Sequence, residues 1–427
     1  MTQLRKGLNL FDGVTLGIGS IMGSGVLFLP SYTHGIAGDG AVLSWIFTTL
    51  LCFPLIVVFK VMVDQVPNES GLHGWVSLGL GQHIGNSVPY ILLGTVILGM
   101  PIAAIIAGSY VSNALDLGTT GILATAISIV AISTIANILG IKAGSTSQKW
   151  VAGGLFIVAG ALIFLSTPSA IHESGQQTFQ IDWHSTAMGS VVAFWAFAGF
   201  ENMSFMAGEF KNPRRDLPLA IVISLIICAS IYFFLTLNYT LLTKSSAKGS
   251  LDGLNILASA TPFSSISIKL LAAFAFVAVL TNFISWIWGI SRLIFATAKD
   301  GLLPQTLGKL ETKSQTPRAA ILALSTGFVA SIAIFSQFPH LIDTCLRIVS
   351  TNFLFIYLLA VAAYFQTAKT VKEKILGAIL GSLCLYGLIV SGSHVFYPLT
   401  LVAVSALYTN LKKESRSHDL STNSKSY

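Results

Sequence analysis

The feature that most constrains this chain is a series of long apolar runs separated by short polar breaks. A helix needs about 20 apolar residues to cross the hydrocarbon core of a bilayer, and many of the runs reach that length. Only 10% of the residues are charged, whereas soluble proteins carry about 25%. The runs also lack the short alternating segments of a membrane β-barrel. We therefore expect an all-α polytopic membrane protein. The expected spans are twelve, at residues 11–35, 40–64, 87–114, 119–140, 148–167, 186–207, 218–243, 265–298, 316–337, 341–365, 374–392 and 394–411.

The basic residues indicate how the spans are oriented. With a cytoplasmic N-terminus, 19 of the 24 Lys and Arg residues fall in cytoplasmic segments, and only Lys244, Lys248 and Lys269 lie in outer loops. This asymmetry follows the positive-inside rule, so the net charge of +7 needs no nucleic-acid partner. The first run is too long for a signal peptide. We expect a bacterial inner (cytoplasmic) membrane protein with both termini inside and a disordered tail at 412–427.

Patterns for metal binding and catalysis are missing from the sequence. Its four cysteines lie in apolar runs without metal-ligand spacing. Neither the phosphate-binding pattern GxxxxGK[ST] nor the catalytic patterns HExxH and GxSxG occur. We therefore expect no metal, no cofactor and no enzymatic activity.

The first span carries residues that weaken a helix in the middle of the membrane. Its stretch GIGSIMGSGVLFLP, residues 17–30, contains four glycines and two serines, and each glycine costs a helix about 1 kcal/mol relative to alanine. Small residues can allow helices to pack closely. The alternative, which we favour, is that the helix is broken here.

A second interruption occurs in the sixth span, where AFWAFAGFENMSF (residues 193–205) places Gly199 and Glu201 at membrane depth. A carboxylate at mid-span costs about 2.5–3.5 kcal/mol on insertion scales. Glu201 is either a gating or proton-linked group or a structural acceptor for freed backbone N–H groups. Asp343 and Arg347, in contrast, are four residues apart and can pair on one helix face.

The two interruptions divide the chain into corresponding halves. Each opens a set of five spans, which predicts an inverted repeat of about 11–167 and 186–365, followed by two extra helices at 374–411. Interrupted spans at matching positions indicate a transporter binding site. A break presents free N–H groups to a carboxylate and free C=O groups to an ammonium. An amino acid carries both groups.

Three stretches identify the family that this sequence resembles. They are SIMGSGVLFLP, FWAFAGFENMSFMAGEFKNPRRDLPLAI and SRLIFATAKDGLLP, and they resemble the amino acid–polyamine–organocation superfamily of transporters. Within the superfamily, ILGMPIAAIIAGSY (residues 97–110) and GEFKNPRRDLPLA most resemble the bacterial exporters of L-methionine and branched-chain amino acids. The resemblance implies a LeuT-type 5+5 fold with helices 1 and 6 unwound at mid-membrane. A lysine that some relatives carry inside the fifth span is missing, since Lys149 lies at its cytoplasmic start.

The resemblance also implies roles for residues at matching positions. Ser24 and Gly25 match positions that hold the substrate carboxylate, and the carbonyls of Ile21, Trp195 and Ala198 match those that face the ammonium. The full expected substrate site is Ser20, Ile21, Gly23, Ser24, Gly25, Met100, Ala104, Trp195, Ala198 and Gly199, with Glu201 and Trp286 as gating or proton-linked residues.

The third span supplies no charge to pair with a charged substrate side chain, because Met100 and Ala104 lie in an apolar stretch. We therefore expect a secondary transporter that exports methionine, leucine, isoleucine and valine by alternating access. A proton-coupled importer, an exchanger and, more remotely, a transporter-like receptor are the alternatives. The expected partners are an amino acid and membrane lipid, while a coupling proton and a homodimer stay open.

Overall fold

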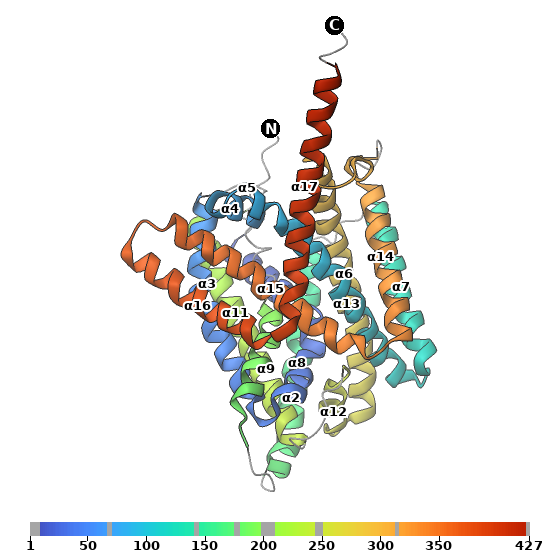
Figure 1. The fold of residues 1–427 in the computed structure, drawn as a ribbon. Helices are drawn as coiled ribbons and strands as arrows, with labels where there is room; N and C mark the ends of the chain where they lie inside the picture. Colours follow the sequence, from blue (N-terminus) through green and yellow to red (C-terminus); the bar gives the residue numbers. More distant parts are fainter. Residues whose placement is uncertain are drawn as a thin grey trace.

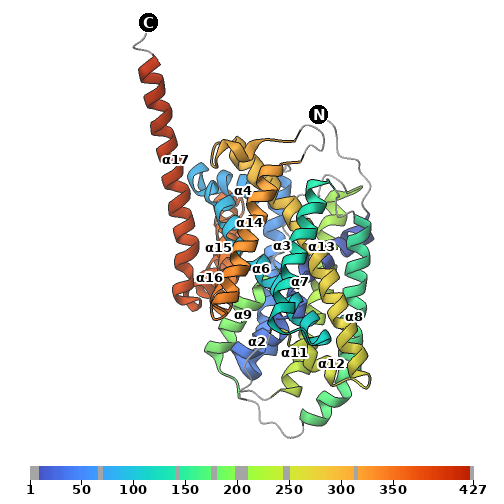
Figure 2. The same ribbon diagram turned by 90° about the vertical axis from the view of Figure 1, so that its right-hand side faces the viewer.

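The computed structural model describes residues 9–65, 71–140, 145–174, 180–197, 210–243, 251–311 and 316–423, which form a bundle of α-helices with short 3₁₀ turns (Figures 1 and 2). The first half contains α1 (Leu10–Met22), η1 (Gly25–Leu27), α2 (Leu29–Ala37), η2 (Gly38–Gly40), α3 (Ala41–Gln65), α4 (Gly71–Leu80), α5 (Gln82–Gly85), α6 (Ser87–Leu115), α7 (Gly118–Ile138) and α8 (Ser145–Ser174). The second half contains α9 (Trp183–Phe197), α11 (Pro213–Leu242), α12 (Leu254–Ser259), α13 (Ser264–Lys299), η4 (Gln305–Gly308), α14 (Arg318–Gln337), α15 (Leu341–Thr367), α16 (Val371–Val390), η5 (Gly392–Val395) and α17 (Phe396–Asn423).

Nine helical stretches of the described residues are long and apolar enough to cross a membrane. The prediction of an all-α polytopic protein is thereby confirmed, but three of the twelve predicted spans are not among the nine as separate crossings. Residues 11–35 are divided between α1 and α2, and residues 186–207 continue past α9 into residues outside the described part. The third, residues 394–411, is the apolar beginning of α17, which then becomes polar.

The outside of the bundle carries large apolar side chains. Phe164, Ile157 and Ile389 are 78%, 69% and 69% exposed. Such side chains on long apolar helices are expected to face lipid, since lipid is as apolar as they are. The same surface in water would expose far more apolar area than a soluble monomer does.

The centre of the bundle is built around α6 and α15. In each of their spans, 72% of the most apolar window is buried, more than in any other candidate span of the described residues. Helix α6 packs against α7, α13 and α15, and α15 also packs against α4, α9 and α16. Side chains of α6 and α15 are therefore well placed to line an interior site.

The C-terminal end differs from the sequence expectation. Residues from 412 to Asn423 continue α17 as a helix, where the sequence predicts a disordered tail. No glycine or proline follows Pro398, and Lys412, Lys413 and Glu414 are good helix formers. The helix therefore propagates beyond the apolar part, and Figure 2 shows α17 extending past the end of the bundle.

Candidate functional site: a cavity at a broken helix

The first predicted break is present in the structure. Helix α1 ends at Met22, and Gly23 then takes φ 36° and ψ −134°, a conformation that favours glycine. A single 3₁₀ turn follows before α2 begins at Leu29. Pro30 lies in the first turn of α2, and because proline has no N–H it suits a helix start and cannot continue a helix from the preceding turn.

Two buried tyrosines satisfy carbonyl groups on either side of the break. The Tyr232 hydroxyl of α11 donates to the Met22 carbonyl at 3.2 Å, and the Tyr110 hydroxyl of α6 donates to the Leu27 carbonyl at 2.5 Å. Tyr110 also accepts a hydrogen bond from the Leu254 N–H at 3.2 Å. Backbone groups freed inside a membrane need partners from the protein, and these hydroxyls supply two of them.

A cavity of about 530 Å³, counted to its open mouth, lies beside the break. Side chains and backbone from α1, the break, α6, α9, α13 and α15 form its walls. The lining residues are Ile21, Met22, Gly23, Ser24, Gly25, Thr95, Val96, Gly99, Met100, Trp195, Ala196, Asn282, Trp286, Val349 and Phe353.

The structure brings together most of the site residues that the sequence predicts and that it describes. Those lining the cavity are Ile21, Gly23, Ser24, Gly25, Met100, Trp195 and Trp286. Ala104 does not line it: this residue is fully buried one turn after Met100, so its methyl group belongs to the packing of α6. Ser20 lies in the last turns of α1, but its side chain is outside the description, so its role at the site stays a prediction.

Other predicted site residues lie outside the described part of the chain. These are Ala198, Gly199 and Glu201, and with them the whole of the second predicted break. Helix α9 ends at Phe197, immediately before them. The side chain of Lys149, in α8, is also outside the description. Their roles stay predictions.

Several cavity residues were not predicted from the sequence. Asn282 is the one for which a signal existed, because it is a polar residue in an apolar run and lies four residues before Trp286, on the same helix face. Val349 and Phe353 are also four residues apart and share a face of α15. As apolar residues in an apolar span, they cannot be recognised from the sequence as residues of a site. Thr95 is likewise an ordinary hydroxyl residue of a membrane helix.

Aromatic packing fixes the indole that faces the cavity. Trp195 of α9 meets Phe28, at the start of α2, edge to face with ring centroids 5.3 Å apart. A Cβ added at Gly99 would meet the Trp195 ring at 3.4 Å, an ordinary van der Waals distance, so the indole packs against α6 at this position. The second half of the broken helix is thus packed directly on a wall of the cavity.

The described walls of the cavity are polar at a few points only. Thr95 donates to the Ile91 carbonyl at 2.7 Å and accepts from the Asn352 carboxamide at 3.0 Å. Ser24, Asn282 and the indoles of Trp195 and Trp286 are the other lining side chains with polar atoms, and none of the described lining residues is charged. A charged group entering this space would find no opposite charge on a described side chain.

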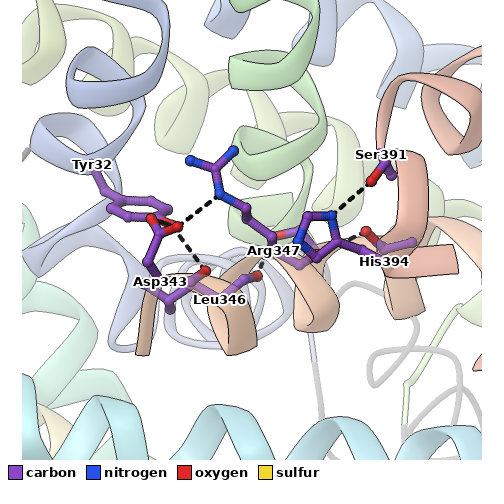
Figure 3. A network of polar contacts seen from close by, with 8 residues as sticks. Tyr32, Asp343, Leu346, Arg347, Ser391 and His394 are labelled. Atoms are coloured by element: carbon purple, nitrogen blue, oxygen red, sulfur yellow. Dashed lines mark hydrogen bonds and ion pairs between the residues drawn. The ribbon is translucent and has the colours of Figure 1, made fainter. Parts of the chain in front are cut away.

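A polar network, which we term the clasp, connects α2 with α15 (Figure 3). It consists of Tyr32, Asp343 and Arg347: the Tyr32 hydroxyl donates to Asp343 Oδ1 at 2.6 Å, and Arg347 Nε donates to Asp343 Oδ2 at 3.0 Å. The predicted Asp343–Arg347 pair is therefore confirmed, and Tyr32 is an added partner. Figure 3 also shows His394 of η5 beside Arg347, with its ring bound to the Ser391 carbonyl at 2.7 Å.

A membrane-crossing bundle that surrounds a cavity at a helix break defines the class of membrane carriers. Comparison with known sequences agrees, since residues 8–418 match the amino acid permease family. The chain belongs to this family, so it is an amino acid transporter and not an enzyme, and the family implies a LeuT-like fold.

Two similar proteins match nearly the full chain, and a third matches three quarters of it. It is 26% identical over 420 residues to the uncharacterized amino acid permease YecA of Bacillus subtilis (strain 168), covering 96% of this chain and 97% of that one. It is 23% identical over 409 residues to the L-methionine/branched-chain amino acid exporter YjeH of Escherichia coli (strain K12), covering 94% and 96%. The glutamate/serine transporter AimA of Bacillus subtilis (strain 168) is 27% identical over 350 residues, covering 75% and 64%.

Proposed function

We propose that this amino acid permease moves neutral apolar L-amino acids, namely methionine, leucine, isoleucine and valine, out of the cell across the cytoplasmic membrane. The observation that carries the proposal is the cavity at the α1 break, because no described side chain lining it is charged. The backbone ends at the break suit the ammonium and carboxylate that all amino acids share. The described part of the wall, which carries no charge, then favours substrates with uncharged side chains.

The apolar character of the remaining wall supports the same substrate class. Met100, Val349 and Phe353 present thioether, branched aliphatic and aromatic surfaces to the cavity. Flexible apolar substrates such as methionine and leucine gain from burial against such groups. The similarity to the exporter YjeH favours both this class and the outward direction.

We further propose that transport occurs by alternating access in a twelve-span, two-repeat arrangement. In the proposed orientation the clasp lies on the outer side of the cavity, between α2 and α15. A clasp at this position would hold the outer entrance closed while the substrate reaches the cavity from inside. Opening then requires the Tyr32–Asp343 hydrogen bond to break.

The test is counterflow in proteoliposomes. Vesicles are loaded with unlabelled methionine, and the entry of labelled methionine is followed against competing amino acids. Saturable entry that leucine, isoleucine and valine inhibit, and that arginine and glutamate do not, supports the proposal. Inhibition by arginine or glutamate, or no counterflow from folded protein, refutes it.

Direction and coupling need a second measurement on the same vesicles. Net methionine flux is recorded with and without a pH gradient, for wild type and Glu201→Gln. We expect the gradient to drive export and the substitution to abolish its effect, because a neutral amide cannot carry a proton. Gradient-driven uptake would instead identify an importer, and obligatory one-for-one exchange would identify an exchanger.

A further inference from the structure

The cavity wall holds a carboxamide that has no partner within the described part of the protein. Asn282 of α13 lines the cavity, and its carboxamide forms no hydrogen bond with any described residue. Two carboxamides elsewhere in the bundle are held by hydrogen bonds to neighbouring helices. Asn137 donates to the Ser133 and Ile284 carbonyls, and Asn238 donates to the Ile163 carbonyl and to two hydroxyls.

The carboxamide of Asn282 is half-buried and faces the cavity, so a polar group that enters the cavity can reach it. Amides transferred from water into apolar environments lose free energy unless a new hydrogen bond compensates. Along α13, Val279 and Phe283 are buried and Trp286 lies one turn further on the same face, while the hydroxyls of Thr281 and Ser285 donate to carbonyls of their own helix. A polar group that enters the cavity can therefore form the hydrogen bonds that the Asn282 carboxamide lacks within the described protein.

The place of Asn282 in the cavity indicates which polar group this is. A Cβ added to Gly23 would lie only 3.0 Å from Asn282 Nδ2, so the carboxamide lies directly against the residue that ends α1. Gly23 belongs to the break, where backbone groups would meet the ammonium and carboxylate of an amino acid. Val349 and Phe353, which would meet an apolar side chain, come from α15 instead.

We infer that Asn282 is a substrate-binding residue that hydrogen-bonds the charged groups on the α-carbon of the amino acid and makes no contact that distinguishes one side chain from another. The inference rests on the proposed function and deepens it. It adds a side chain to the backbone groups that are proposed to bind the ammonium and carboxylate of the substrate. A carboxamide suits the task, since it can donate to a carboxylate and accept from an ammonium. The absence of a Cβ at Gly23 is what lets the carboxamide approach the break.

The test compares two asparagine substitutions of similar shape. Asn282→Leu removes the hydrogen-bonding atoms in the cavity, and Asn238→Leu removes a carboxamide that is fully engaged between α8 and α11. For each purified variant, the thermal unfolding midpoint is measured without substrate. Half-saturation constants for methionine, leucine and valine are then measured by counterflow.

We expect opposite outcomes for the two variants. Asn282→Leu breaks no bond within the described protein, so the unfolding midpoint stays near that of wild type. Its half-saturation constants rise by the same factor for all three substrates, about ten- to hundredfold, as for hydrogen bonds to charged groups. Asn238→Leu lowers the unfolding midpoint, and the folded protein keeps its half-saturation constants within about twofold of wild type.

Two results overturn the inference while leaving the proposed function intact. One is wild-type transport with half-saturation constants for Asn282→Leu that are unchanged within about twofold. The other is a loss confined to one of the three substrates, which would place Asn282 against the side chain. If folded wild-type protein shows no counterflow and no binding with any amino acid, the proposed function fails, and this inference fails with it.

Discussion

Removing a single hydroxyl from the clasp should shift the protein toward a state in which the outer entrance is open. Tyr32→Phe keeps the ring but deletes the donor that bonds Asp343 Oδ1 at 2.6 Å. The Asp343–Arg347 ion pair at 3.0 Å stays in place within α15. The substitution therefore cuts the connection between helices without leaving an unpaired charge.

The expected size follows from the exposure of the clasp. A hydrogen bond to a charged group contributes about 1.5–3 kcal/mol when it is shielded from water. Here the Asp343 side chain is 54% exposed and that of Arg347 is 24% exposed, so water replaces part of the lost bond. We expect a net loss of about 1 kcal/mol, which is about a fivefold shift in population.

Thiol labelling inside the cavity measures this shift. Cys52, Cys228 and Cys384 are buried, so only the partly exposed Cys345 needs replacement, by alanine. A reporter cysteine is then placed in the cavity wall as Val349→Cys. A membrane-impermeant thiol reagent is added to the outer face of sealed vesicles, and its reaction rate reports the open population.

We expect the Tyr32→Phe variant to label about five times faster than its parent. Tyr90→Phe is the matched control, because the Tyr90 hydroxyl donates to the Leu302 carbonyl, away from the clasp. An unchanged rate in Tyr32→Phe would refute the reasoning. Equal acceleration in both variants would refute it too, since it would reflect general loosening.

Three further predictions concern the break and the cavity. Gly23→Ala should destabilise the protein by about 1–3 kcal/mol, because φ is 36° and the new Cβ would lie 3.0 Å from Asn282; Gly289→Ala, where a Cβ meets nothing within 4 Å, should leave the thermal midpoint unchanged or raised. Tyr110→Phe should lower that midpoint by the equivalent of about 1–3 kcal/mol, since it leaves the buried Leu27 carbonyl without this donor, and a midpoint equal to wild type would contradict the assigned bond. Val349→Asp should weaken methionine counterflow and allow inhibition by lysine, because it adds a negative charge to a wall without described charges; continued insensitivity to lysine would show that the wall does not select by charge.

The first break was predictable because its cause is local. Glycines concentrated in one stretch, followed by Pro30, weaken a helix whatever surrounds it. Trp195 and Trp286 were found through family resemblance, and the structure places both at the cavity. The second break and Glu201 stay predictions, since they lie outside the described residues.

Site residues whose contacts come from distant parts of the chain could not be predicted from local sequence patterns. Asn282 is 259 positions from Gly23 in sequence, yet the two meet across the cavity. Tyr32 and Asp343 are separated by 311 positions. Ala104 was expected in the wall because it belongs to the third-span stretch that faces the site. It does share a face of α6 with Met100, but it lies one turn further along the helix, where it is fully buried and does not reach the cavity. Such errors reflect packing between helices, which span positions alone do not determine.

The two tyrosine hydroxyls at the break have a consequence for what a bound amino acid does. Tyr232 ties the end of α1 to α11, while Tyr110 ties η1 to α6. The two pieces of the broken helix are thus anchored to different neighbours, and the backbone at Gly23 and Ser24 is the only covalent link between them. A bound amino acid that hydrogen-bonds both the end of α1 and η1 would take the place of the missing helical turn. The substrate would then connect the two helix pieces for as long as it is bound.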